Sequence, residues 1–142
     1  RLELARKMGA DAAVNTLSED LTEVMHKQRL VEGFDIGLEM SGSGAALTQM
    51  VSVMRNGGKI SLLGISNKPV PMDMNKIICK GLTLQGIYGR KMDNWHQMSY
   101  MVQGGLDLTP VITHRFHYTQ FEEGFAAMNS GKSGKVILDW SK

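Results

Sequence analysis

The sequence predicts an α/β fold in which a partial doubly wound parallel sheet is followed by a separate carboxyl-terminal segment. From Arg1 to Tyr88, short apolar segments suited to β-strands alternate with amphipathic segments suited to helices. This alternation is typical of parallel strands whose connecting helices cover both faces of a sheet. The spacing changes after Leu106, so residues 107–142 are expected to belong to another unit.

Helix caps and strand-forming residues define the first elements. Residues 1–8 form an amphipathic helical pattern that ends at Gly9, a residue favoured just after a helix. A short strand is expected over 12–15, and Ser18 is expected to cap the following helix. The apolar residues 34–40 predict another strand, which ends in front of a Ser-Gly pair.

The middle of the chain predicts two helices and two strands. Apolar residues recur at helical spacing over 47–54, and the Asn-Gly-Gly sequence that follows is expected to stop this helix. The next strand is expected over 59–65. Asp73 is expected to cap a helix that runs to Lys80 and ends at Gly81, before a strand over 82–88.

The last third of the chain predicts two further helices. Asp93 is expected to cap a helix that ends at two glycines, 104–105. Thr119 and Glu122 have the spacing of a capping box at the start of the second helix. Strands are expected on either side of this second helix, over 112–116 and 136–140.

Composition and charge exclude several classes of partner. The net charge is +2 without a basic block, so we expect no nucleic-acid partner. No apolar run approaches the roughly 20 residues that a membrane span needs. Cys79 is the single cysteine and no signal peptide is visible, so we expect a cytoplasmic protein without an internal disulfide. Because Arg1 already lies in a helical pattern, we expect the chain to be a fragment.

The Gly42-Ser43-Gly44 sequence follows a predicted strand, as a dinucleotide-binding fingerprint would. The fingerprint requires a third glycine where Leu47 stands, and an acidic residue about 20 positions further on, where the chain has 62–64. The match therefore fails. An ordinary glycine-rich turn is expected instead, although such turns still line the ligand crevice of an open α/β sheet.

Two loops at the ends of predicted strands are candidates for ligand binding. Their backbone groups could hydrogen-bond a planar amide, and the missing Cβ of Gly64 and Gly89 would let a ligand approach closely. Turn glycines without any ligand are the alternative interpretation, and composition alone favours it. The candidate residues in these loops are Leu63, Gly64, Ile65, Ile87, Tyr88 and Arg90.

Histidines do not predict a metal site in this sequence. Only His114 and His117 lie near each other, and their spacing on a strand would place them on opposite faces. No cysteine or acidic cluster accompanies them, so we expect no metal ligand in this chain.

Several segments of the chain resemble the zinc-dependent medium-chain dehydrogenase/reductase family. The similarity covers the whole chain and is most distinctive in its last three segments. Within the family, it is strongest with the bacterial members that act on L-threonine. The segments that carry the resemblance are 1–10, 34–42, 57–65, 86–92, 106–116 and 131–138.

The resemblance implies an NAD-dependent enzyme that oxidises the hydroxyl of L-threonine and gives 2-amino-3-ketobutyrate. Residues 1–106 would be an incomplete Rossmann-type NAD-binding domain that lacks its first two strands, and 107–142 would belong to the catalytic, GroES-like domain. Without those two strands, 12–15 would lose its neighbour and be displaced, swapped or disordered, and 35–39 would become a bare sheet edge. The alternatives are another zinc-dependent polyol or alcohol dehydrogenase, and a non-catalytic nucleotide-binding scaffold protein.

The resemblance also implies roles for particular residues. Arg1 would lie near the adenosine ribose of NAD, and Arg90 near the cofactor or the substrate carboxylate. The residues 63–65, 87 and 88 would contact the nicotinamide end. Zinc ligands and catalytic residues would all lie upstream of Arg1, so none is expected here. A homo-oligomer, a tetramer in the family, would pair the sheet edge 82–88 between subunits.

Overall fold

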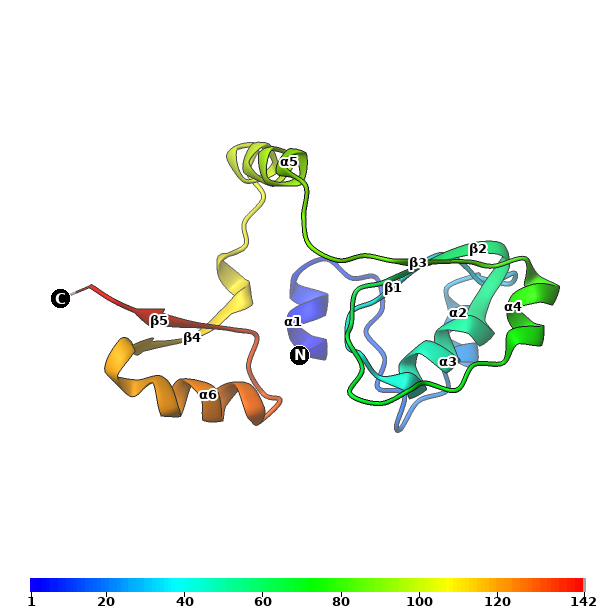
Figure 1. Cartoon of the computed structure of the whole chain (residues 1–142), viewed down its shortest axis with the longest axis horizontal. Helices are drawn as coiled ribbons and strands as arrows, with labels where there is room; N and C mark the ends of the chain where they lie inside the picture. The colour runs from blue at the N-terminus through cyan, green and yellow to red at the C-terminus, as the bar shows by residue number, and fades with distance from the viewer. Residues whose placement is uncertain (142) are drawn as a thin grey trace. The chain divides into compact units, whose positions relative to one another are not determined.

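The computed structural model describes residues 1–141, which form two compact units. One unit combines Arg1–Ser18 with the residues from Lys91 onward, and the other unit is Glu19–Arg90. The α-helices and β-strands of both units are labelled in Figure 1. The predicted division at residue 106 concerns the domains of a longer enzyme, and it stays a prediction.

The Glu19–Arg90 unit contains a parallel sheet of three strands. The strands are β1 (Phe34–Glu39), β2 (Met54–Leu62) and β3 (Thr83–Gly86), and they lie in the order β1-β2-β3. This arrangement confirms the predicted parallel α/β architecture. The strands predicted over 59–65 and 82–88 extend too far at their carboxyl ends, because the chain leaves the sheet after Leu62 and Gly86.

Three helices connect and flank these strands. They are α2 (Leu21–Lys27), α3 (Gly44–Val53) and α4 (Met74–Lys80). The predicted caps of α4 are confirmed, since the Asp73 side chain accepts the Lys76 amide and Gly81 is left-handed with φ +58°. The predicted Ser18 cap of α2 is wrong. Asp20 caps this helix and accepts the Thr22 amide at 2.8 Å.

The core of this unit lies between the sheet and the helices α3 and α4, which pack on β1 and β2 respectively. Val51, Met54 and Ile60 are almost completely buried, and partly buried side chains such as Leu47 and Leu84 surround them. Helix α3 ends at Val53, one residue earlier than predicted, and Met54 begins β2. The Asn-Gly-Gly sequence therefore lies within the strand instead of preceding it.

Strand β1 forms an open edge of the sheet in this unit, because it pairs only with β2. Ile36 and Leu38 are 67% and 54% exposed along it. A hollow of about 350 Å³ borders this edge and is lined by apolar side chains that include Phe34 and Met50. The bare apolar edge predicted over 35–39 is confirmed within the chain.

The strand predicted over 12–15 is wrong. These residues form no strand, and the Ala13 carbonyl accepts a hydrogen bond from the Arg6 side chain at 2.9 Å. A β-strand needs a neighbouring strand for its backbone hydrogen bonds. The described sheets place no strand beside these residues, so the local sequence preference is not realised.

The other unit contains two parallel strands and a covering helix. Strand β4 (Ile112–His117) pairs with β5 (Lys135–Asp139), and α6 (Phe121–Asn129) packs on both. Gly124 permits this packing, since a Cβ there would lie 3.1 Å from the Leu138 side chain. The unit also contains α1 (Leu2–Lys7), α5 (Met92–Gln103) and the short 3₁₀ helices η1 (Thr109–Val111) and η2 (Tyr118–Gln120).

Two predicted helix caps in this unit are wrong. Lys91, not Asp93, is the N-cap of α5, and its amide donates to the Asn94 side chain at 3.0 Å. The Thr119–Glu122 capping box does not form, because Thr119 lies inside η2, which immediately precedes α6. The Thr119 hydroxyl instead contacts His117 Nδ1 at 2.8 Å. None of the helices in residues 1–141 is long and apolar enough to cross a membrane.

Candidate functional site

The carboxyl ends of the three parallel strands meet at one edge of the sheet. Glu39 is in register with Leu62, and Leu62 is in register with Gly86. Backbone hydrogen bonds continue just beyond the strands. The Glu39 carbonyl accepts the amides of Leu63 and Gly64 at 2.8 and 2.9 Å, and the Leu62 carbonyl accepts the Ile87 amide at 2.9 Å. The loops that begin at Leu63 and Ile87 therefore leave the sheet side by side.

These two loops present apolar side chains to solvent. Leu63 and Ile87 are 41% and 40% exposed, whereas Ile65 and Tyr88 are 76% and 95% exposed. Large apolar side chains at a strand-end edge are suited to contact a flat, weakly polar ligand. The structure thus brings together five of the residues predicted for cofactor binding.

The glycines of the two loops have different roles. A Cβ at Gly64 would overlap the Gly42 amide nitrogen and the Glu39 carboxylate, so the neighbouring turn already fills that space. The expectation that Gly64 leaves room for a ligand is therefore wrong. Gly89 has φ +72°, and no atom lies within 4 Å of its hypothetical Cβ. The space at Gly86 is equally open, so the loop after β3 is the one that leaves room for a ligand.

Glu39 is a buried acidic residue that the sequence analysis missed. Only 4% of its surface is exposed, and its carboxylate accepts hydrogen bonds from Ser41 and Gly42. The hydroxyl of Ser41, more than any other group, lowers the pKa of Glu39, while burial opposes this shift. An acidic residue at the end of an apolar strand, directly before a glycine-rich turn, was the signal that could have revealed it.

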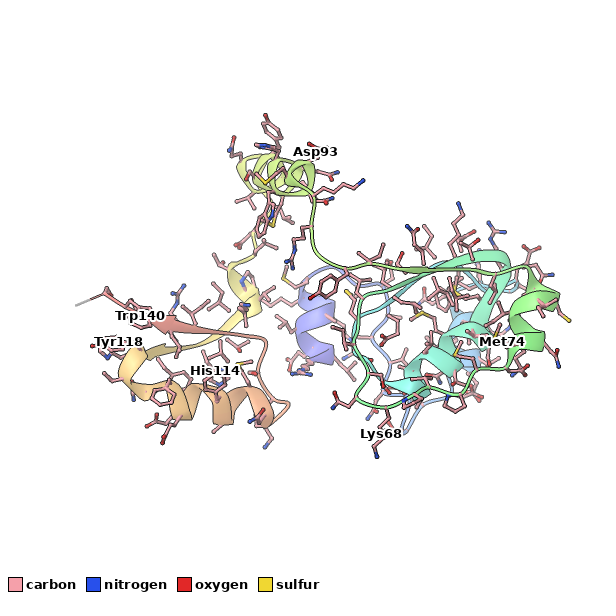
Figure 2. The ribbon with its side chains drawn as sticks, viewed as in Figure 1. Lys68, Met74, Asp93, His114, Tyr118 and Trp140 are labelled. Carbon is pink, nitrogen blue, oxygen red and sulfur yellow. The ribbon has the colours of Figure 1, made fainter. Side chains whose placement is uncertain are left out.

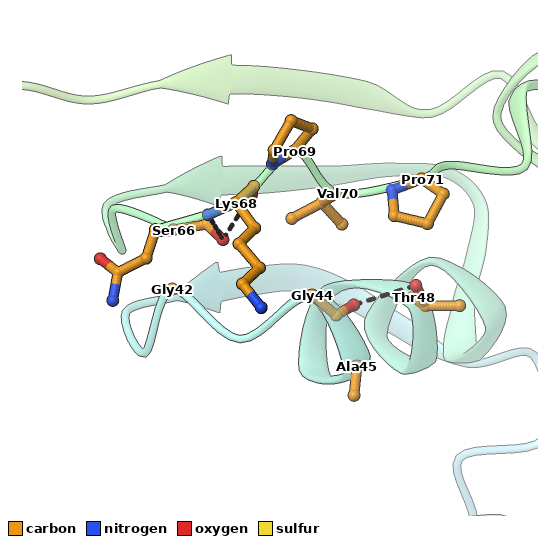
Figure 3. A pocket seen from close by; sticks show the side chains of 10 residues that line it. Gly42, Gly44, Ala45, Thr48, Ser66, Lys68, Pro69, Val70 and Pro71 are labelled. Carbon is orange, nitrogen blue, oxygen red and sulfur yellow. Dashed lines mark hydrogen bonds between the residues drawn. The ribbon is translucent and has the colours of Figure 1, made fainter.

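The Gly42-Ser43-Gly44 sequence forms a strand-turn-helix connection. The Ser43 hydroxyl caps α3 and accepts the Ala46 amide at 3.3 Å. A cleft of about 480 Å³ lies between this turn and the segment 66–71. Figure 3 shows the Lys68 side chain extending across the cleft toward Gly42 and Gly44. The predicted cofactor residues do not line this cleft, although Ile65 directly precedes one of its walls.

The two candidate arginines lie in different units. Arg1 belongs to the unit that contains β4 and β5, where its Nε donates to the Ser133 carbonyl at 3.0 Å. Arg90 is exposed and is the last residue of the Glu19–Arg90 unit, two residues beyond Tyr88.

The histidines on β4 point to alternate faces, as their spacing predicted. His114 is partly buried and stacks on Phe116 with ring centroids 6.1 Å apart, whereas His117 is exposed. Figure 2 shows His114 near α6, and Tyr118 next to Trp140 at the far end of the strands. Within residues 1–141, no group of three or more His, Cys, Asp or Glu side chains could hold a metal ion.

The residues of this sheet edge lie in a part of the chain that matches a known family. The family model described as zinc-binding dehydrogenase matches residues 1–104 of the chain. The chain belongs to the zinc-binding dehydrogenase family. Strands β1, β2 and β3 and the two strand-end loops all lie within the matched residues.

Relatives of this zinc-binding dehydrogenase chain are similar to it over its whole length. It is 56% identical to the L-threonine 3-dehydrogenase of Aeromonas salmonicida and 58% identical to that of Deinococcus deserti. The chain spans 42% of the length of each relative. Among solved structures, the alcohol dehydrogenase TADH from Thermus sp. ATN1 has a TM-score of 0.86 at 24% identity, over 99% of this chain and 41% of that one. This likeness confirms the Rossmann-type fold class.

The family implies zinc and a nicotinamide cofactor, and the described residues fit the two differently. Residues 1–141 contain no group of side chains that could hold a zinc ion by themselves, so we derive no catalytic step through zinc from them. The strand-end edge does fit one end of NAD, since it combines exposed apolar side chains with open space at Gly86 and Gly89.

Proposed function

We propose that this chain forms the carboxyl-terminal part of an enzyme that oxidises L-threonine to 2-amino-3-ketobutyrate with NAD. The observation that carries the proposal is identity of 56% and 58% to two L-threonine 3-dehydrogenases, each aligned with the entire chain. Identity at this level over the entire chain supports the same activity for the enzyme to which this chain would belong.

The strand-end loops would hold the nicotinamide end of NAD. In this proposal Leu63, Gly64, Ile65, Ile87 and Tyr88 would contact the nicotinamide ring and its amide. When bound, NAD would accept the hydride that leaves the carbon bearing the threonine hydroxyl. The chain's apolar side chains would exclude water from the ring, which favours hydride transfer over side reactions.

Arginines would bind the charged and polar parts of the ligands. We assign Arg1 to the adenosine ribose of NAD. Arg90 would lie near the cofactor or the threonine carboxylate, where a guanidinium can form two parallel hydrogen bonds. The chain contributes no catalytic residue in this proposal, and the zinc ligands lie in the part of the enzyme that this chain does not include.

The same proposal covers organisation and location. Residues 1–106 would belong to the NAD-binding domain and 107–142 to the catalytic, GroES-like domain. The enzyme would be a cytoplasmic homo-oligomer whose subunits pair through residues 82–88. Strand β3 supports this pairing, since it is an edge strand of the described sheet.

A chimaera tests the proposed function. This chain would replace the matching segment of the Aeromonas salmonicida L-threonine 3-dehydrogenase, to which it aligns over its full length. Formation of NADH would be followed with L-threonine and, separately, with polyols and simple alcohols. We expect L-threonine to have the highest kcat/KM with NAD. A folded chimaera that prefers a polyol or alcohol would contradict the proposal and favour another zinc-dependent dehydrogenase.

A further inference from the structure

We propose that Glu39 is a positioning residue for the cofactor-binding edge, because its side chain and its main chain fix the two loops that meet there. These loops are the turn 41–43 and the segment 63–65. The geometric part of this inference stands on contacts within the Glu19–Arg90 unit. Its consequence for NAD rests on the function proposed above.

The Glu39 carboxylate collects three donors from the turn that follows β1. Its Oε1 accepts the Ser41 hydroxyl at 2.5 Å and the Ser41 amide at 2.9 Å. The Gly42 amide lies 3.1 Å from each of the two carboxylate oxygens. Hydrogen bonds to an ionised acceptor are stronger than those between neutral groups. The turn is therefore held by the side chain of the residue that ends the strand.

The main chain of Glu39 holds the second loop. Its carbonyl oxygen accepts both the Leu63 amide and the Gly64 amide, so one oxygen sets the direction in which this loop leaves β2. The Leu63 and Ile65 side chains are 41% and 76% exposed, so burial in the core does little to fix them. Their positions depend mainly on the backbone that carries them.

The two loops also touch each other directly. A Cβ at Gly64 would overlap the Gly42 nitrogen, and a Cβ at Gly42 would overlap the Ile65 carbonyl. Backbone packed this closely transmits a displacement, because no flexible side chain lies between the loops. If the 41–43 turn loses its anchor, residues 63–65 lose the surface against which they rest.

Glu39→Gln is the informative variant because it preserves shape and removes the charge. The side-chain NH₂ of glutamine cannot accept a hydrogen bond, and it would replace one of the two carboxylate oxygens that now accept from the turn. At least one donor of the turn would then lose an acceptor. We expect backbone exchange at Ser41, Gly42, Leu63 and Gly64 to become about tenfold faster, which is the scale of one lost charge-assisted hydrogen bond. The amide of Ile60, in the buried part of β2, should change little.

Hydrogen exchange followed by NMR on the 142-residue chain tests this geometry without any cofactor. Glu23→Gln, at an exposed position in α2, is the matched control. Ser41→Ala is a milder second variant that removes only the hydroxyl donor, and it should produce the same pattern with a smaller change. Unchanged exchange at Leu63 and Gly64 in both variants would overturn the proposal, as would a uniform increase over all amides.

Steady-state kinetics of the chimaera test the consequence for NAD. We expect Glu39→Gln to raise the KM for NAD about tenfold and to change the KM for L-threonine less than about twofold. A purely structural loss would lower the amount of active enzyme and leave both KM values unchanged. If the parent chimaera is inactive with L-threonine, the proposed function fails, and the exchange experiment still decides the role of Glu39.

Discussion

The Nζ of Lys80 donates a hydrogen bond to the carbonyl of Met54 at 2.8 Å, which ties α4 to the residue where α3 gives way to β2. The same ammonium group lies 2.6 Å from the Ser52 carbonyl and 3.3 Å from the Val51 carbonyl. These carbonyls lie at the end of a helix, where intrahelical partners are missing. A cation is also favoured there by the helix dipole. Lys80 therefore stabilises the junction beside the buried core.

Replacement of Lys80 tests this contribution. Lys80→Met keeps the apolar stem and removes the ammonium, so the carbonyls of Ser52 and Met54 lose their donor. We expect the free energy of unfolding to fall by about 1–3 kcal/mol. Lys76→Met is the control, because its Nζ contacts only the Ser52 hydroxyl at 3.3 Å among the hydrogen bonds described, and it should change stability by less than about 0.5 kcal/mol. Urea titration measures both, and equal effects would contradict the assignment.

Gly64 and Gly86 should respond differently to a methyl group. Gly64→Ala would force its Cβ against Gly42 and the Glu39 carboxylate, so we expect a loss of about 1–3 kcal/mol of stability. Gly86→Ala meets no atom within 4 Å and should change stability by less than about 0.5 kcal/mol. Thermal unfolding compares the two variants. A neutral Gly64→Ala would show that the two loops are not packed as described.

Acid should weaken the fold in part through Glu39. Because the folded state lowers its pKa, this carboxyl stabilises the protein above its unfolded pKa, and the contribution is lost as the pH falls through the folded pKa. Glu39→Gln should therefore lose less stability than the parent chain between about pH 6 and about pH 3. Asp107 and Asp139 also have lowered pKa values. Both are present in the parent chain and in the Glu39→Gln variant, so their contributions to the pH dependence of stability cancel. Parallel stability curves would contradict this role.

The isolated chain should lack the enzyme's activity. A protein zinc site usually needs three or four ligands, and no such group exists in residues 1–141. We expect no stoichiometric zinc after dialysis and no NADH formed from L-threonine. NAD should bind weakly, because the Gly42-Ser43-Gly44 turn does not match the dinucleotide-binding fingerprint, whose helix N-terminus binds the pyrophosphate of the cofactor. Metal analysis, an assay of NADH formation and titration calorimetry check these three points, and a low-micromolar Kd for NAD would contradict the third.

The open edge of β1 should promote self-association. Ile36 and Leu38 expose apolar surface beside unpaired strand backbone, which is a template for pairing with another chain. We expect the isolated chain to be oligomeric by light scattering. Replacement of both residues by lysine should shift it toward the monomer, whereas the exposed Val31, also replaced by lysine, serves as the control. A monomeric parent chain would refute this expectation.

Local signals predicted much of the fold. The Asp73 cap and the Gly81 terminator define α4 within a few residues of sequence, so its bounds agreed with the structure. The local pattern over 12–15 predicted a strand that does not form, because a strand needs a paired neighbour; only the family resemblance implied that this neighbour is missing. Ser18 failed as a cap because Asp20, two positions later, offers a carboxylate at the correct turn.

At the candidate site, the sequence predicted which loops lie at the sheet edge but not which residues of distant loops contact each other. Parallel topology implied that the residues after β2 and β3 lie at one edge, and the structure places Leu63 and Ile87 there. The partner of Gly64 could not be predicted, because its contact with Gly42 joins two loops that are far apart in sequence. Glu39 was missed although a local signal was present, because an acidic residue ends an apolar strand there just before the glycine-rich turn that supplies its donors.

The position of the nicotinamide ring in the chimaera shows whether the two strand-end loops hold NAD. A crystal structure of that protein with NAD would show which residues surround the ring. We expect Leu63, Ile65 and Ile87 to lie in van der Waals contact with it, at about 4 Å between heavy atoms. A nicotinamide ring bound elsewhere, with the loops after β2 and β3 facing solvent, would contradict the proposed role of these loops in binding NAD.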